Sequence, residues 1–279
     1  MKKIIAAIDG LKYSESTVQY AIRIAKEANA HLVGVLLDDE TYTSYKVYDL
    51  VVKENVPENK LKLYDAKDKE TRIKSAEKFE QACRKAELAY TIHHDRDIAI
   101  QELIHESIYA DLLVIDAKET LTHYDEKLPT RFIRELLTDV QCPVLIVPSK
   151  FRSIEKIYQL FDGEPSSAYA IKMFSYLFPF LGETETEILS VKNPGQTLHL
   201  PDNRLMKEYI KRYYKKVNYK VVKGLPEIEI VEYLKQQPKN MLVVLGAYRR
   251  GRVSRWFRQS MADYLMKELS VPLFIAHNK

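Results

Sequence analysis

An internal repeat is the feature that most limits how this 279-residue chain can fold. In each half the opening predicted strand ends in Asp-Gly, first at Asp9-Gly10 and then at Asp162-Gly163. Each half also finishes with a short apolar strand pattern that contains a proline, at Cys142-Pro143 and at Val271-Pro272. Because the same signals occur twice in the same order, we expect two similar domains. They cover residues 1–149 and 150–279.

Within each half, strand and helix patterns alternate. Strands are predicted at 3–8 and 31–37, with a helix from about Ser14 to Asn29 between them, so the sheet should be parallel with a right-handed crossover. The other first-half elements are strands at 88–93, 110–115 and 142–147 and helices at 65–86, 98–108 and 131–137. The second-half elements are strands at 155–161, 187–191, 219–222, 241–245 and 271–276 and helices at 168–181, 204–216, 227–236 and 260–269.

Composition indicates an ordinary globular protein, since 46% of the residues are hydrophobic. The apolar runs are far shorter than the roughly 20 residues that cross a bilayer, so no membrane contact is expected. The N-terminal apolar run, about five residues before Asp9, is too short for a signal peptide. Cys83 and Cys142 lack redox or zinc spacing, which favours buried thiols and a cytoplasmic protein.

Charge is distributed unevenly along the chain. Residues 1–150 carry 22 Lys and Arg against 26 Asp and Glu, a net −4, whereas residues 151–279 carry 21 against 13, a net +8. An anionic partner is therefore expected in the second half. The acidic segment 38–60 contains Tyr42, Tyr45 and Tyr48 and is expected to be a surface excursion that either has a function or covers apolar surface.

The predicted helix at 204–216 is strongly basic, and its cations form either an exposed face or a binding stripe. They are Lys207, Lys211, Arg212, Lys215 and Lys216. Three histidines, His93, His94 and His105, have no carboxylate or cysteine at a convincing ligand spacing, so no metal site is recognised. The chain has no nucleophile elbow, lysine-bearing phosphate loop or zinc motif, so catalysis is not favoured.

The stretch from Leu242 to Ala262 has the pattern of a strand, a loop and a helix that could bind an anion. Gly246 permits a sharp turn at the strand end, and the unpaired N–H groups of the next helix, which Ser260 could cap, favour an anion there. The loop is rich in arginine and contains two aromatic residues: Arg249, Arg250, Arg252, Arg255, Arg258, Trp256 and Phe257. It is a phosphate clamp, a nucleic-acid patch or a solvated loop whose aromatics dock on the other half.

Together these residues resemble the universal stress protein family, twice in tandem. The resemblance rests on the Asp-Gly strand ends, on fourth strands of the type Leu-Leu-Val-Ile or Leu-Val-Val-Leu, and on the proline-containing last strands. It implies an α/β fold of two tandem Rossmann-like domains, each a doubly wound five-stranded parallel sheet of order 3-2-1-4-5. It also implies that the halves pack through their fifth strands as an intramolecular pseudo-dimer, which protects those edges.

Many family members bind ATP through a fourth-strand loop with three spaced glycines followed by Ser or Thr. In the second half Gly246 and Ser260 match this pattern, Arg249 and Gln259 replace two of the glycines, and Gly251 lies within the loop off the motif. In the first half the glycine positions hold Asp116, Glu119 and Pro129, and only Thr130 is retained. Carboxylates there would repel a triphosphate, so we expect no ATP site in the first half.

The resemblance implies a candidate ATP or phosphate site in the second half. It comprises Asp162, Gly163, Val191, Gly246, Arg249, Gly251 and Ser260. Asp9 and Asp162 would lie beside the nucleotide, or serve only as polar turn residues. We expect a stress-response regulatory protein; the alternatives are an interaction or scaffold protein that binds no nucleotide, and a slow ATPase. A homodimer or protein partner fits this role, whereas nucleic acid is not favoured.

Overall fold

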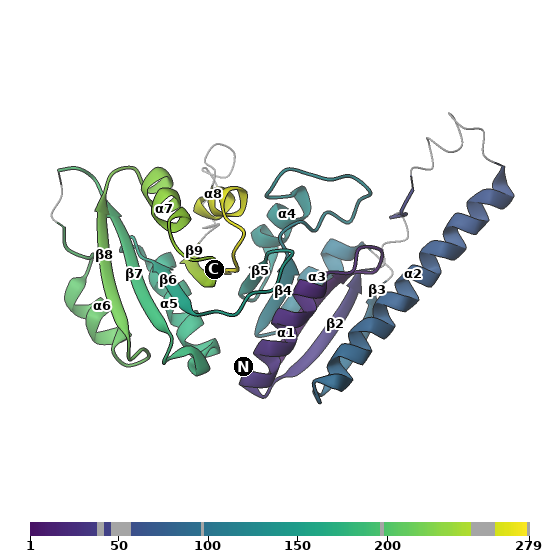
Figure 1. The fold of residues 1–279 in the computed structure, drawn as a ribbon, viewed down its shortest axis with the longest axis horizontal. Helices are drawn as coiled ribbons and strands as arrows, with labels where there is room; N and C mark the ends of the chain where they lie inside the picture. The colour runs from purple at the N-terminus through teal and green to yellow at the C-terminus, as the bar shows by residue number, and fades with distance from the viewer. Residues whose placement is uncertain (38–41, 46–56, 96–97, 196–197, 247–259, 278–279) are drawn as a thin grey trace.

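The computed structural model describes residues 1–37, 42–45, 57–95, 98–195, 198–246 and 260–277 (Figure 1). The first-half elements are β1 (Lys3–Asp9), α1 (Glu15–Ala28), β2 (His31–Leu37), α2 (Glu58–Lys85), β3 (Tyr90–Asp95), α3 (Ala99–Ser107), β4 (Leu112–Asp116), α4 (Arg131–Asp139) and β5 (Val144–Val147). The second-half elements are β6 (Lys156–Leu160), α5 (Pro165–Leu177), β7 (Glu185–Lys192), α6 (Asn203–Ile210), β8 (Val217–Lys223), α7 (Pro226–Lys235), β9 (Met241–Gly246), α8 (Met261–Glu268) and β10 (Leu273–Ala276).

All ten of these strands form one sheet, in the order β3-β2-β1-β4-β5-β10-β9-β6-β7-β8. Neighbouring strands within each half are parallel, and both halves have the predicted order 3-2-1-4-5. The two halves meet where β5 and β10 pair antiparallel, with Leu145 opposite Phe274, so the predicted pairing through the fifth strands is confirmed. The expected division between residues 149 and 150 lies in the connection from β5 to β6 and, as a domain boundary, stays a prediction.

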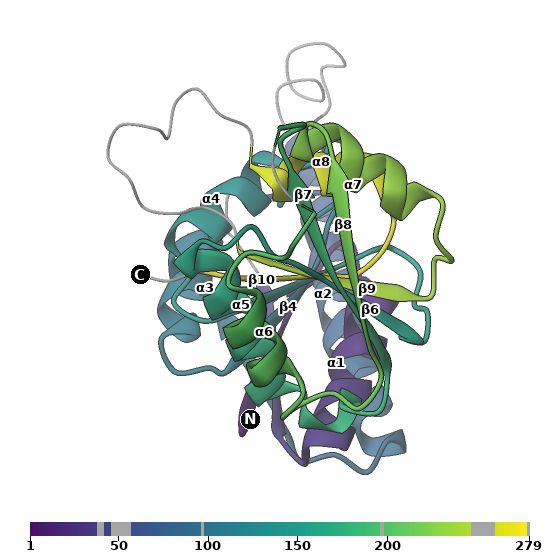
Figure 2. The same ribbon diagram turned by 90° about the vertical axis from the view of Figure 1, so that its left-hand side faces the viewer.

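Helices cover both faces of the sheet, and this explains why the central strands β1, β4, β5, β9 and β10 are apolar at nearly every position. In β1, Ile4, Ala6 and Ile8 face a core that also contains residues of α1, α2, α5 and α6, whereas Ile5 and Ala7 face residues of α3, α4, α7 and α8. Figure 2 shows α5 and α6 on one side of β7 and β8 and α7 on the other. Since each face is buried, these central strands carry no alternation of polar and apolar residues, whereas the edge strand β8 alternates half-buried and exposed residues from Val217 to Val221.

Several predicted helices differ in extent from those observed. The basic helix predicted at 204–216 is wrong in length, because α6 ends at Ile210 and the chain turns there, with the N–H groups of Tyr213 and Tyr214 both donating to the Ile210 carbonyl. Of the five cations assigned to it, only Lys207 is helical. The helix predicted at 168–181 begins earlier and ends at Leu177, before a short 3₁₀ turn that starts at Pro179, which has no N–H to continue an α-helix.

The acidic excursion contains more helix than predicted and covers part of the sheet edge. Helix α2 begins at Glu58 rather than near residue 65, runs beside β3 and projects beyond the sheet (Figure 1). Tyr48 lies outside the described residues, whereas Tyr42 is buried.

Both cysteines are buried and neither forms a disulfide, and burial raises the pKa of the Cys83 thiol to about 12. Among the described residues, no helix is long and apolar enough to span a membrane.

Candidate functional site

The carboxyl ends of the parallel strands bring the motif positions of each half to one edge. Strand β1 pairs with β4, so Asp9 and Asp116 end neighbouring strands in the first half. Strand β6 pairs with β9, so Asp162 follows one strand and Gly246 ends the next in the second half. Ligands of open parallel sheets bind at such an edge, where the chain leaves the strands.

In the first half, Asp9 is buried beneath a tyrosine from the excursion. Its Oδ1 accepts the N–H of Leu11 at 2.7 Å and that of Lys12 at 3.1 Å, and its Oδ2 accepts the hydroxyl of Tyr42 at 3.0 Å. The guanidinium of Arg72 donates to the Tyr42 carbonyl at 2.6 Å and lies 5.9 Å from its ring centroid. The part of the excursion described here therefore covers the end of β1.

Glu119 is a second buried carboxyl at this edge. Its Oε1 accepts the N–H groups of Thr120 and Leu121, both at 2.9 Å. Burial, together with the negative charge of Asp9, raises the pKa of Glu119 to about 8. Burial also raises the pKa of Asp9, although its two N–H contacts oppose that shift.

Asp116 and Thr130 complete the first-half positions. Asp116 Oδ2 accepts the hydroxyl of Ser14 at 2.8 Å. Thr130 caps α4 by accepting the N–H of Ile133 at 3.2 Å, and its own hydroxyl donates to the Glu119 carbonyl. The hydroxyl that matches the motif is thus committed to the helix cap, and the motif positions Asp116 and Glu119 at this edge offer an anion no cation. These contacts agree with our expectation of no ATP site in this half, which stays a prediction.

In the second half, the end of β6 is a turn built around Asp162 and Gly163. The exposed Asp162 accepts the N–H of Glu164 at 2.9 Å and the hydroxyl of Ser167 at 2.6 Å, both at Oδ1. Gly163 has a φ of +92°, and a Cβ there would lie 2.6 Å from Cβ of Pro201. Both residues therefore have a turn-forming role that needs no ligand.

Gly246 touches the same turn from β9. A Cβ on Gly246 would lie 2.5 Å from the carbonyl oxygen of Ser166, so α5 can approach β9 only because this residue is glycine. Ser166 is the neighbour of Ser167, which contacts Asp162, and so the first turn of α5 joins two of the motif positions. Asp162, Gly163 and Gly246 are thus brought together around one helix start.

The other predicted site residues are spread over neighbouring elements. Val191 is half-buried near the end of β7 and pairs with Val222 of β8. Ser260 is confirmed as the N-cap of α8, where its hydroxyl accepts the N–H of Ala262 at 3.4 Å. Arg249 and Gly251 lie outside the described residues, as does the rest of the arginine-rich loop from residue 247 to 259.

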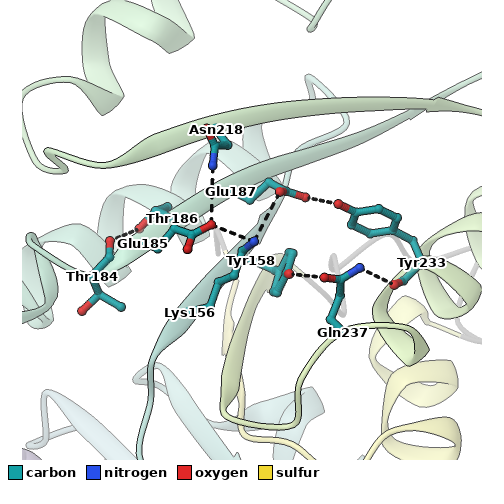
Figure 3. A network of polar contacts seen from close by, with 9 residues as sticks. All are labelled: Lys156, Tyr158, Thr184, Glu185, Thr186, Glu187, Asn218, Tyr233 and Gln237. Carbon is teal, nitrogen blue, oxygen red and sulfur yellow. Dashed lines mark hydrogen bonds and ion pairs between the residues drawn. The ribbon is translucent and has the colours of Figure 1, made fainter.

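A polar network at the opposite edge of the second half was not predicted (Figure 3). Lys156 Nζ lies 2.8 Å from Glu185 Oε1 and 3.7 Å from Glu187 Oε2. The hydroxyl of Tyr233 donates to Glu187 at 2.7 Å, and that of the buried Tyr158 donates to Gln237 at 2.9 Å. These contacts attach α7 to the starts of β6 and β7. No spacing in the sequence predicts these contacts, because the partners are up to 79 positions apart.

Histidine and acidic residues also meet outside the motif. His93 Nδ1 lies 2.5 Å from Glu106 Oε1, and the other oxygen of Glu106 lies 3.1 Å from Lys3 Nζ. Among the residues described, no group of three or more His, Cys, Asp or Glu side chains is placed to hold a metal ion. The pair therefore joins β3 to α3 and to the start of β1.

The buried carboxyl of Glu119 predicts how stability depends on pH. Its folded-state pKa of about 8 exceeds its usual 4.5, so the folded protein binds more protons between these values, and the free energy of unfolding falls as pH rises through this window. We expect Glu119→Gln, which mimics the protonated acid, to reduce that fall by about 1 kcal/mol or more between about pH 5 and 8. Urea unfolding at several pH values measures this change in the free energy of unfolding.

The exposed Glu135 supplies the control for this measurement. Glu135→Gln changes the net charge equally and should leave the pH dependence as in the unmodified protein. If Glu119→Gln follows the unmodified protein across the whole range, Glu119 is ionised in the folded state and the assignment is wrong.

Comparison with known proteins agrees with this architecture. A sequence model described as the universal stress protein family matches residues 1–148. A universal stress protein from Archaeoglobus fulgidus has a similar structure, with a TM-score of 0.72 at 16% identity over 99% of this chain and 98% of its own. A functionally unknown protein from Pseudomonas aeruginosa has a TM-score of 0.59 at 14% identity, over 99% of this chain and 92% of its own.

No curated protein matches the chain in sequence. The two structural similarities, at such low identity, show the fold alone. The family assignment rests on the sequence match, which covers more than half of the 279 residues. The chain belongs to the universal stress protein family.

Proposed function

We propose that this stress-response protein acts as a regulator and binds one ATP, or a related phosphate-bearing nucleotide, per chain in its second half. The observation that carries the proposal is the opposite chemistry of the two motif edges. Where the first half has Asp116 and the buried Glu119, the second half has Gly246 and Arg249 at the same motif positions. Glycine leaves room for phosphate and arginine can pair with it, whereas the acidic side chains of the first half offer phosphate no cation.

Isothermal titration with ATP tests this proposal, and the repeat offers a matched pair of variants. Arg249→Gln should weaken ATP binding by about tenfold or more, since a hydrogen bond from a charged donor contributes about 1.5–3 kcal/mol. Glu119→Gln changes the equivalent position of the first half and should leave the affinity unchanged. No heat and no thermal shift at millimolar ATP, or equal effects of both variants, would overturn the proposal.

A second candidate is an interaction protein of the same fold that binds no nucleotide. It is favoured by the packing of the motif residues, because Gly163 fits against Pro201 and Gly246 against Ser166 without any ligand. Mass spectrometry of small molecules that copurify from the host distinguishes the two candidates. The third alternative is a slow ATPase. It requires ATP hydrolysis by the unmodified protein that is lost in the variant Ser260→Ala.

A further inference from the structure

A pocket of about 220 Å³ lies at the junction of the two halves, where Ala117 and Lys118 of the first-half motif loop line part of it. Its floor includes Ile146 of β5 and Leu273 of β10, which are direct partners in the antiparallel pairing. Met266 of α8 also lines it, and all three side chains are at most 2% exposed. The pocket therefore has a rigid apolar base to which both halves contribute.

The rim of this pocket is basic. Lys118 of the first half, Lys150 of the connection between the halves and Lys239 of the second half line it, and all three residues are exposed. Within the part of the chain that the structure describes, none of the three forms an ion pair and no Asp or Glu lines the pocket. Arg152 is held at the rim by donating to the Ser270 carbonyl at 3.0 Å.

The volume, the apolar base and the basic rim of the pocket indicate which kind of ligand would fit it. Drug-sized ligands occupy pockets of roughly 300–1,000 Å³, so this volume suits a smaller molecule than a nucleotide. An apolar base favours a hydrocarbon body, and uncompensated lysines favour an anionic end. We propose that the pocket binds a small amphiphilic anion, with its apolar tail on the Ile146–Leu273 floor and its carboxylate or phosphate at the three lysines.

Such a ligand would contact both halves at once. Since it binds the folded junction and not the unfolded chain, it stabilises the paired arrangement of β5 and β10 by mass action. The inference is independent of nucleotide binding, because the pocket shares no residue with the candidate ATP site.

Octanoate is a suitable probe because it combines an apolar tail with a carboxylate. Octanol has the tail without the negative charge and acetate has the carboxylate without the tail, so both serve as controls. We expect octanoate to bind, and octanol and acetate to bind much more weakly. With ¹³C-methyl labelling of the six methionines, the Met266 signal should shift while that of Met206, on α6, stays in place. Octyl phosphate, in a parallel titration, distinguishes a carboxylate from a phosphate preference.

Lysine variants test the head group. Replacing Lys118, Lys150 and Lys239 by Gln should weaken octanoate binding by about tenfold, given the modest strength of exposed ion pairs. The control replaces Lys67, Lys69 and Lys85, exposed on α2, for the same change in net charge. The proposal is overturned if octanoate does not bind, if octanol binds equally well, if Met266 does not respond, or if both triple variants weaken binding equally.

Discussion

Replacing Phe274 by alanine is expected to lower the free energy of unfolding by about 3–5 kcal/mol. This side chain is fully buried on β10, the strand through which the second half joins the first. Its ring contacts Phe174 at a centroid distance of 5.1 Å and Phe178 at 5.6 Å. Truncation would leave a cavity beneath these two rings, and a rigid sheet centre cannot collapse to fill it.

Guanidinium unfolding followed by circular dichroism measures this loss. Phe274→Leu retains most of the apolar volume and should cost about 1 kcal/mol or slightly more, which separates cavity formation from the loss of aromatic contacts. Phe274 lies opposite Leu145 of the first half, so the alanine variant should also weaken the contact between the halves. Their unfolding transitions should then become more widely separated. A loss of stability no larger in the alanine than in the leucine variant would contradict the proposed packing.

Gly246→Ala is expected to destabilise the protein by about 3 kcal/mol, at the upper end of the usual cost of overpacking. The added Cβ would lie 2.5 Å from the Ser166 carbonyl oxygen and 2.9 Å from the Ser167 nitrogen. Both atoms belong to the backbone at the start of α5, so the strain cannot be relieved by a side-chain rotation. The helix would have to move away from β9.

The matched control is Gly195→Ala, where an added Cβ meets nothing within 4 Å. Its thermal unfolding midpoint should stay close to that of the unmodified protein, since open surface sites change stability by about 0.5 kcal/mol or less. Similar midpoints for both variants would show that α5 can shift freely, and the explanation of Gly246 by packing would then fail. The outcome also matters for the nucleotide proposal, because a glycine required for packing is weaker evidence of a phosphate loop.

Much of the fold was predictable because its signals are local. The alternation of apolar strands with amphipathic helices identified the ten strands in order, and the strand at 31–37 agrees with β2 at both ends. Errors arose where distant contacts set the length of an element. Helix α6 stops at Ile210, and the chain then turns so that Tyr214 is buried and the Lys215 N–H donates to the Gly182 carbonyl. The spacing of basic residues contains no information about that contact.

The candidate site was predictable only in part. The repeat placed Gly246 and Ser260 at matching positions, and Ser260 does begin a helix. The repeat did not predict that Tyr42 would lie on Asp9, because these residues are 33 positions apart and come from different segments. Nor did it predict the network of Lys156 and Glu187, which forms only once β6 and β7 are paired.

The sequence by itself determined the repeat, the alternating α/β pattern and the difference in charge between the two halves, because these depend on the periodicity and identity of neighbouring residues. Only the tertiary structure decided that Glu119 is buried beside Asp9, that Gly246 fits against Ser166, and that Ile146 and Leu273 form the floor of a basic-rimmed pocket. Burial, close approach and pocket shape arise from contacts between segments far apart in the chain, and such contacts exist only after the sheet has assembled.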